Sequence, residues 1–372
     1  MRRSLVSAFT ALLMGGTMTA APALADITIG FIGPVTGPVA AYGIQASNGA
    51  QTAIEAINAR GGINGENLVL KIYDDAADPK QAVSAANQVA GDGVLFVVGP
   101  VTSNAAMPAS NVLEENGIVM VTPSATGSEL SSRGLWNVFR VIGRDDQQAD
   151  YAAEYVARHW PDKRIAVVHD NETYGKGLAD SFREALNAAG VKEVYYGSVT
   201  RGEKDYNVMV NRLKDEKVDY IYFGGYHPEG GILLRQMREQ GVKAILVGGE
   251  GMNTTELGAI AGGAIDGTIF TSSVDVSKEP AAREAIEQFK AKNIPAEVFT
   301  INGYAAVQVL ADGIKKIGNA DDPEGVAEVL KSGKPVPTIL GDITYGERGD
   351  MTSKAFSLFQ WKDASTIVPL AD

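Results

Sequence analysis

The feature that most constrains the fold is a repeated alternation between short apolar runs and longer stretches of helical periodicity. Several of the runs are apolar throughout, as expected of parallel strands that are covered on both faces. Between them apolar residues recur at i, i+3, i+4 and i+7, and glycines end the helical stretches in "ARGGINGEN" and "NAAGVKEV". Repeated strand–helix units predict a parallel α/β fold. The predicted strands are Asp26–Gly33, Leu68–Asp74, Val94–Gly99, Ile118–Val121, Arg164–His169, Val194–Gly197, Tyr220–Gly224, Ile245–Gly248 and Thr268–Thr271.

The number of strands predicts two sheets, because so many strands exceed one comfortable open sheet. The pattern also restarts along the chain: "RIAVVHDNETYGKGLADSF" repeats the strand–loop–helix order of "VLFVVGPVTSNAAMPAS". A polar stretch, "VIGRDDQQAD", lies between these two segments. We therefore predict two similar lobes with a boundary in this polar stretch.

The N-terminal residues predict export. Arg2 and Arg3 precede a mostly apolar stretch, Ser4–Met14, which is too short to span a bilayer, and Ala23-Leu24-Ala25 is a small-x-small cleavage pattern. Residues 1–25 are thus predicted to be a secretory signal peptide, and its removal from the 372 residues leaves 347. No later stretch is apolar for long enough to cross a membrane, so a soluble exported protein is expected.

Composition argues against several classes of function. The formal net charge of −12, which becomes −14 without Arg2 and Arg3, and the pI near 4.9 disfavour nucleic acid and anionic membranes as partners. Without cysteine, no disulfide, thiolate nucleophile, cysteine-ligated metal or lipid anchor is expected. His159, His169 and His227 are widely spaced, and the sequence has no HExxH, GxSxG or P-loop pattern and no GxGxxG after a strand. We therefore predict no enzyme, no metal and no cofactor.

Polar residues follow the predicted strands at the edge where open parallel sheets bind ligands. In the first half of the chain these are Tyr42, Ser103 and the loop Ser124-Ala125-Thr126, and in the second half they are Tyr174, Tyr226 and Glu250. Ser103 stands where a helix N-cap is expected, beside free N–H groups that favour an anion. The loop adds a carbonyl, an N–H and a hydroxyl, and Glu250 lies between glycines. An anion pocket that faces an acid suits a zwitterion, and tyrosines suit the walls between them.

Each of these residues also has an ordinary structural interpretation. Ser103 alone is an N-cap more often than a ligand group. "TPSATG" alone is more often a turn, a glutamate among glycines is usually solvated, and the tyrosines are more often half-buried surface residues. Only their shared place at the strand ends favours a binding site.

An ordered series of motifs carries a resemblance to a known family over nearly the whole chain after residue 25. The series is "GPVAAYG", "INARGGINGENL", "YDDAADPKQAV", "TPSAT", "IAVVHDNETYGKGLA", "GEKDY", "GGYHPEGG", "LRQ" and "GYAA". On these motifs the chain resembles the type I periplasmic binding proteins, and among them those that bind branched-chain amino acids for ABC transporters. The resemblance implies two Rossmann-like lobes with parallel sheets, joined by three crossover segments in a Venus-flytrap arrangement. Lobe 1 would comprise residues 26–144 and 273–351, and lobe 2 residues 145–272 and 352–372.

The resemblance also implies roles for individual residues. Ser103 and Thr126 would hold the α-carboxylate of an amino acid, and the Ser124 carbonyl, the Thr126 hydroxyl and Glu250 would hold its ammonium group. The side-chain pocket would be lined by Tyr42, Val101, Thr102, Tyr174, Tyr226 and Phe299. Close relatives have a disulfide between the positions of Ala77 and Thr102, and this departure makes Thr102 the change most suited to alter ligand preference.

The resemblance further implies a monomer in the periplasm that captures leucine, isoleucine or valine and delivers it to an inner-membrane ABC transporter permease. Two alternatives remain open. The same clamp could bind another small amino acid or an amide, or it could be a sensor module that reports to a receptor.

Overall fold

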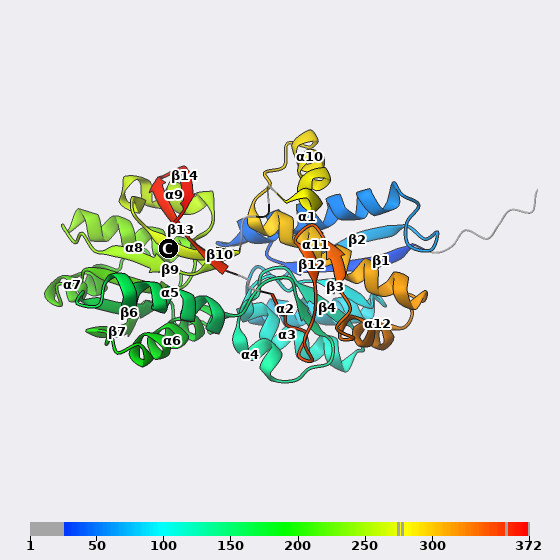
Figure 1. The fold of residues 1–372 in the computed structure, drawn as a ribbon, viewed down its shortest axis with the longest axis horizontal. Helices are drawn as coiled ribbons and strands as arrows, with labels where there is room; N and C mark the ends of the chain where they lie inside the picture. The colour runs from blue at the N-terminus through cyan, green and yellow to red at the C-terminus, as the bar shows by residue number, and fades with distance from the viewer. Residues whose placement is uncertain (1–25, 274–275, 277–278, 354–355, 371–372) are drawn as a thin grey trace, which may run out of the picture.

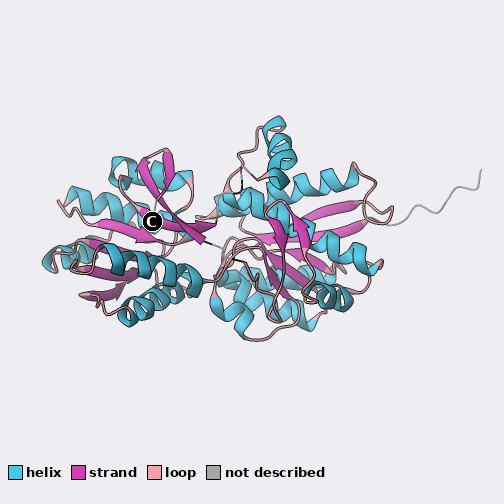
Figure 2. Cartoon of the chain, viewed as in Figure 1, coloured by secondary structure: helices cyan, strands magenta, loops and turns pink. Residues whose placement is uncertain are grey.

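Two sheets organise the protein in its computed structural model, which describes residues 26–370 except 274–275, 277–278 and 354–355 (Figure 1). The predicted signal peptide lies outside the described residues. In Figure 2 helices cover the strands of both lobes, as the strand–helix alternation predicted. The fold class is α/β, with one large sheet in each of two lobes and a small two-stranded sheet formed by Val336–Thr338 and Gly341–Ile343.

The sheet of the first lobe has five strands, in the order β2-β1-β3-β4-β5, and every neighbouring pair is parallel. Alternate residues of its central strands enter hydrophobic clusters on opposite faces, which is why the strands read as continuous apolar runs. The elements are β1 (Ile27–Gly33), α1 (Ala40–Asn58), β2 (Leu68–Asp74), α2 (Pro79–Gly91), β3 (Phe96–Val98), α3 (Ser103–Glu115), β4 (Val119–Thr122), α4 (Ser128–Ser132) and β5 (Val138–Arg140).

The sheet of the second lobe has seven strands, in the order β14-β13-β10-β9-β8-β6-β7. Its first five strands along the chain pair in parallel, and β13 and β14 (Phe356–Asp363 and Thr366–Pro369) add an antiparallel edge. The other elements are α5 (Asp145–His159), β6 (Ile165–His169), α6 (Thr173–Ala188), β7 (Tyr195–Ser198), α7 (Asn207–Asp215), β8 (Tyr220–Gly224), α8 (His227–Glu239), β9 (Ile245–Gly248), the 3-10 helix η1 (Glu250–Met252), α9 (Thr255–Ala261), η2 (Gly262–Ile265) and β10 (Ile269–Ser273).

Between β10 and β13 the chain returns to the first lobe, so it passes between the lobes three times. Figure 1 shows these later elements, in yellow and orange, with the blue and cyan ones of the first lobe. Helix α11 packs on α1 so closely that a Cβ on Gly49 would lie 1.9 Å from the Thr300 carbonyl oxygen. The returning elements are η3 (Pro280–Ala282), α10 (Arg283–Ala291), α11 (Val298–Ile317), α12 (Pro323–Leu330), β11 (Val336–Thr338) and β12 (Gly341–Ile343).

All nine predicted strands are present, with ends that differ from the prediction by at most about two residues. Both parallel sheets and the three crossings agree with the expected fold class. The prediction of lobes with parallel sheets did not include the C-terminal hairpin β13–β14, which adds an antiparallel edge to the second sheet. Strand β5 and the hairpins β11–β12 and β13–β14 were not predicted.

Candidate ligand-binding site

A small cavity lies between the two lobes, where the carboxyl ends of both sheets face each other. Its volume is about 20 Å³, enough for about one water molecule. Ten of the eleven residues predicted for the site line this cavity, and the eleventh, Ala125, is buried between the lining residues Ser124 and Thr126 in the chain. The lining is Tyr42, Val101, Thr102, Ser103, Ser124, Thr126, Tyr174, Tyr226, Glu250, Gly251 and Phe299.

The start of α3 forms one part of the first-lobe wall. The predicted N-cap was wrong by one residue: Thr102 is the cap, and its hydroxyl accepts a hydrogen bond from the Ala105 N–H at 3.4 Å. Ser103 is the first helical residue, and its hydroxyl accepts from the Gly127 N–H at 3.0 Å. Ser103 therefore ties α3 to the loop after β4, at a helix end whose first amides lack partners within the helix.

The loop Ser124-Ala125-Thr126 forms the rest of this wall. The Ser124 hydroxyl donates to the Val101 carbonyl at 2.6 Å, so its side chain is used inside the lobe. The Thr126 hydroxyl bonds to the buried carboxyl group of Asp145, and the Thr126 carbonyl accepts from the Asp145 N–H at 2.9 Å. Since a hydroxyl that donates to a carboxylate keeps its lone pairs, Thr126 can still accept from an ammonium group.

Glu250 occupies the opposite wall, on the second lobe. It is only 3% exposed, so the solvated-loop interpretation does not hold. Its two oxygens accept from the Ser272 hydroxyl and the Ser273 N–H, each at 3.0 Å. Burial raises the pKa of Glu250 to about 8, and these two hydrogen bonds offset only part of that rise. None of the ion pairs among the described residues includes Glu250, so the wall presents a buried acid without a protein cation.

Aromatic side chains from both lobes close the sides of the cavity. The Tyr42 ring lies 5.0 Å from Phe299 and 5.9 Å from Tyr226, and the Tyr226 ring lies 4.9 Å from Tyr174, measured between centroids. All four are at most 6% exposed, which excludes the half-buried surface interpretation for the tyrosines. Phe299 reaches the cavity from α11, in the part of the chain that returns to the first lobe.

Hydrogen bonds that sequence reasoning did not predict link the lobes around the cavity. The Tyr42 hydroxyl donates to the Gly251 carbonyl at 2.8 Å and lies 2.6 Å from Nδ1 of His227. Asn104 donates to the Glu172 carboxylate at 3.0 Å and accepts from the Tyr174 N–H at 3.0 Å. These contacts join residues far apart in sequence, so the only available signal was the position of Asn104 beside Ser103.

A buried pair at the start of α5 connects the two walls. Asp145 accepts from Nε2 of Gln148 at 2.6 Å, and Oε1 of Gln148 accepts from the Glu250 N–H at 3.2 Å. Burial raises the pKa of Asp145 to about 6, although hydrogen bonds from Thr126 and Gln148 lower it. The series of contacts Thr126–Asp145–Gln148–Glu250 thus runs from the first-lobe wall to the second-lobe wall through the first crossing.

A larger cavity of about 520 Å³ lies between α3, α4 and α6, but it shares no residue with the smaller one. Its lining includes Glu129, Asp145, Glu172, Asp180 and Glu184 and no aromatic side chain, and the smaller cavity is therefore the candidate site. Among the described residues no group of three or more His, Cys, Asp or Glu side chains is arranged to hold a metal ion. None of the described helices combines the length and apolarity needed to cross a membrane.

Comparison with known proteins shows the family of this chain. The family model described as "Periplasmic binding protein" matches residues 26–366. The chain belongs to the periplasmic binding protein family. It is 56% identical over 353 residues to the "Leu/Ile/Val-binding protein BraC3" of Rhizobium johnstonii, which covers 95% of this chain and 96% of the relative. It is 44% identical to the "Leucine-, isoleucine-, valine-, threonine-, and alanine-binding protein" of Pseudomonas aeruginosa, which covers 96% of each chain.

A solved member of the periplasmic binding protein family has a similar fold. The branched-chain amino acid transporter substrate binding protein LivJ of Streptococcus pneumoniae, in complex with isoleucine, superposes with a TM-score of 0.84 at 27% identity. The match covers 92% of this chain and 97% of that one. The proteins of this family are substrate-binding components of transport systems.

Proposed function

We propose that this protein is the periplasmic substrate-binding component of an ABC transporter and that it captures leucine, isoleucine and valine between its lobes. The observation that carries the proposal is the buried Glu250, which has no cationic partner among the described residues and faces Ser103 and Thr126 across an aromatic cavity. An α-amino acid supplies the cation for Glu250 and the anion for the N–H and hydroxyl groups of the first lobe. Its aliphatic side chain would fill the space between the tyrosines and Phe299.

Capture requires the walls to separate. A cavity of about 20 Å³ is far too small for an amino acid, so the tyrosines or the lobes must move when one binds. We propose a hinge between lobe 1, residues 26–144 and 273–351, and lobe 2, residues 145–272 and 352–372. An amino acid first held by lobe 1 would gain Glu250 and Tyr226 only when lobe 2 closes. This difference in contacts is what would favour the closed arrangement.

Selectivity among aliphatic side chains is expected to be loose, since one methylene in an apolar pocket is worth only about 1–3 kcal/mol. The relative from Pseudomonas aeruginosa is named for threonine and alanine as well as the branched-chain residues. That name favours a second candidate, in which the same site also accepts smaller amino acids. Thr102 lines the cavity and is the residue whose substitution would test this breadth.

Calorimetric titration with L-leucine, L-isoleucine, L-valine, L-alanine, L-threonine and D-leucine tests the proposal. The branched-chain L-amino acids should bind with micromolar or better affinity, and D-leucine should bind far more weakly because inversion at Cα misplaces one of its three groups. Equal binding of both leucine enantiomers, or no binding of any amino acid, would contradict the proposed site. Recovery of the leucine unchanged after incubation would support the further proposal that the protein is not an enzyme.

The location and partners follow from the same proposal. The signal peptide would deliver the protein to the periplasm, where it would act as a monomer and hand its ligand to an inner-membrane permease. Loss of leucine uptake on deletion of the gene supports a transporter. Normal uptake with a lost response to leucine would instead favour a sensor that reports to a receptor.

A further inference from the structure

A buried arginine lies directly behind the loop that would bind the amino acid head group. Arg140, the last residue of β5, is 0% exposed. Its Nη1 donates to the Ala125 carbonyl at 3.0 Å, and both Nη atoms lie 3.3–3.4 Å from the Gly127 carbonyl. Nη2 also donates to the Ser131 hydroxyl at 2.9 Å, and Nε pairs with the Asp350 carboxylate at 2.8 Å. Both Nη atoms are therefore engaged by hydrogen bonds and Nε by an ion-pair contact that lacks hydrogen-bond geometry. Two of the acceptors are backbone carbonyls of residues 125 and 127.

These contacts set the direction of the groups that would face the ligand. In a planar trans peptide the carbonyl and the N–H of one unit point in opposite directions. Arg140 holds the Ala125 carbonyl, so the N–H of Thr126, in the same peptide unit, points away from Arg140. The Ala125 N–H likewise donates to the Thr122 hydroxyl at 2.9 Å, which turns the Ser124 carbonyl away from Thr122.

A charged donor also changes the strength of the peptide that it holds. A hydrogen bond from a cation to a carbonyl polarises the peptide unit, which makes its N–H a better donor. Arg140 binds the Ala125 carbonyl, so the polarised peptide unit is the one between Ala125 and Thr126, and its N–H is that of Thr126. An N–H that is both aimed and polarised is suited to a carboxylate.

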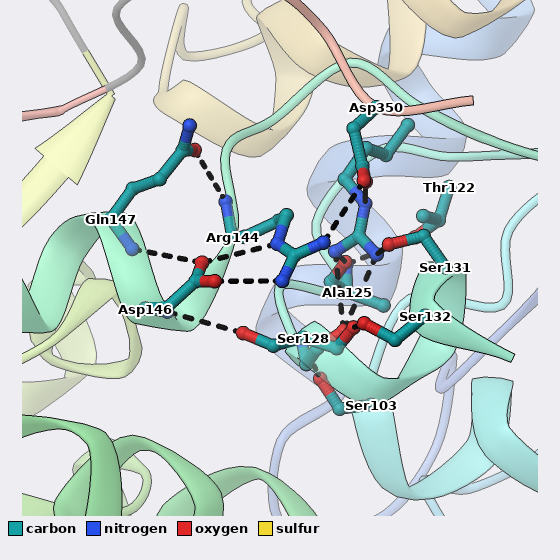
Figure 3. A network of polar contacts seen from close by, with 12 residues as sticks. Ser103, Thr122, Ala125, Ser128, Ser131, Ser132, Arg144, Asp146, Gln147 and Asp350 are labelled. Carbon is teal, nitrogen blue, oxygen red and sulfur yellow. Dashed lines mark hydrogen bonds and ion pairs between the residues drawn. The ribbon is translucent and has the colours of Figure 1, made fainter. Parts of the chain in front are cut away.

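Asp350 fixes Arg140 from a distant part of the chain. Its carboxylate pairs with Arg140 through Oδ1 and with Arg144 through Oδ2 at 3.2 Å. In Figure 3 Arg144 lies between Asp350 and Asp146, and the Asp146 carboxylate forms an ion pair with the Arg144 guanidinium on the side away from Asp350. Arg144 belongs to the first crossing between the lobes and Asp350 precedes the third, so this network joins the head-group loop to two crossings.

We propose that Arg140, held by Asp350, is a positioning residue that directs the Thr126 N–H towards the carboxylate of the bound amino acid. The inference rests on the proposed function and adds a residue that does not line the cavity. Lysine in its place keeps the charge, but one ammonium group does not reproduce the planar fork that spans two carbonyls and a hydroxyl.

The test compares two ligands in the variant Arg140→Lys. L-Leucinamide keeps the ammonium group and the side chain of leucine but lacks the carboxylate charge. We expect Arg140→Lys to weaken the binding of L-leucine by about tenfold to a hundredfold, as for a lost hydrogen bond to a charged group. The binding of L-leucinamide should weaken much less. The leucine-to-leucinamide affinity ratio should therefore fall about tenfold or more, while the leucine-to-valine ratio stays unchanged.

Two further variants keep the test decisive. Asp350→Asn leaves Arg140 in place without its anchor and should lower the same ratio by a smaller factor, which matters if Arg140→Lys does not fold. Arg133→Lys is the matched control, because Arg133 also holds a backbone carbonyl and two side chains in this lobe but not the head-group loop. Its ratio should equal that of the wild type.

The outcomes separate this inference from the proposed function. If Arg140→Lys and Asp350→Asn weaken the binding of leucine and of leucinamide equally, Arg140 only stabilises the lobe. This result overturns the inference but leaves the proposed function standing. A wild-type protein that binds no amino acid overturns the proposed function together with the inference.

Discussion

Substitution of Glu250 by glutamine should change stability and binding in opposite directions. Burial raises the pKa of Glu250 from 4.5 to about 8. A carboxyl group with a raised pKa in the folded state contributes its full stability below pH 4.5 and loses it as the pH rises towards 8. At pH 7 the loss is about 3 kcal/mol, from the 2.5 pH units above the ordinary pKa. Glu250→Gln escapes this cost but gives up about 1 kcal/mol with one of its two accepted hydrogen bonds, so a gain of about 2 kcal/mol is expected.

Binding should respond in the other direction. Glutamine leaves the ligand's ammonium group buried beside a neutral amide, which costs about 3–5 kcal/mol. The dissociation constant for L-leucine should therefore rise by about two to four orders of magnitude. Leucine at a thousandfold excess over its dissociation constant adds about 4 kcal/mol to the wild type and little to the variant. The order of stabilities should thus reverse when leucine is added.

Thermal unfolding at pH 4 and pH 7, with and without leucine, measures both effects. The variant should be more stable than the wild type at pH 7 without leucine, less stable with leucine, and less stable by about 1 kcal/mol at pH 4, where only the lost hydrogen bond counts. Glu239→Gln is the control, since the Glu239 side chain is 63% exposed and should show neither effect. A stability difference that is the same at both pH values would refute the buried-acid argument, and normal leucine binding by Glu250→Gln would refute its role in the site.

Three further predictions concern contacts between the lobes and inside the first lobe. Tyr42→Phe loses the hydrogen bond to the Gly251 carbonyl and should weaken leucine binding, measured by calorimetry, by about 1–3 kcal/mol. The melting temperature of the first lobe should not fall. Unchanged affinity would show that this bond does not favour closure. Asn104→Ala loses two bonds to the second lobe and should weaken binding similarly, whereas Asn87→Ala, which loses only a bond within α2, should not; equal effects would contradict the prediction. Burial raises the pKa of Asp75 to about 7, so its stability contribution falls from about pH 4 to pH 7, and Asp75→Asn should raise the melting temperature at pH 8 but not at pH 4.

The sequence predicted the strands well because each strand of a covered parallel sheet is a continuous apolar run between turns. It did not reveal β13, in which buried and partly exposed residues alternate and a bulge near Trp361 interrupts the pattern. It also placed the α3 cap on Ser103 instead of Thr102, since two adjacent residues with hydroxyl groups both suit a cap.

The candidate site was predictable as far as it depends on strand ends. Phe299 was predicted only from the family resemblance, because it lies on α11, in the segment that returns to the first lobe, and does not directly follow a strand. Arg140 and Gln148 were missed for a different reason: their roles depend on contacts with partners such as Asp350 and Glu250, far away in sequence, and no local pattern encodes such contacts.

The three passages of the chain between the lobes determine when each lobe is complete. The first lobe needs α11, and the second lobe needs β13 and β14, which are among the last described elements of the chain. Until those residues emerge, β10 is an unprotected sheet edge that can pair with another molecule. The second lobe therefore stays incomplete until β13 and β14 have been made, and a chain shortened before β13 should aggregate instead of yielding half of the clamp.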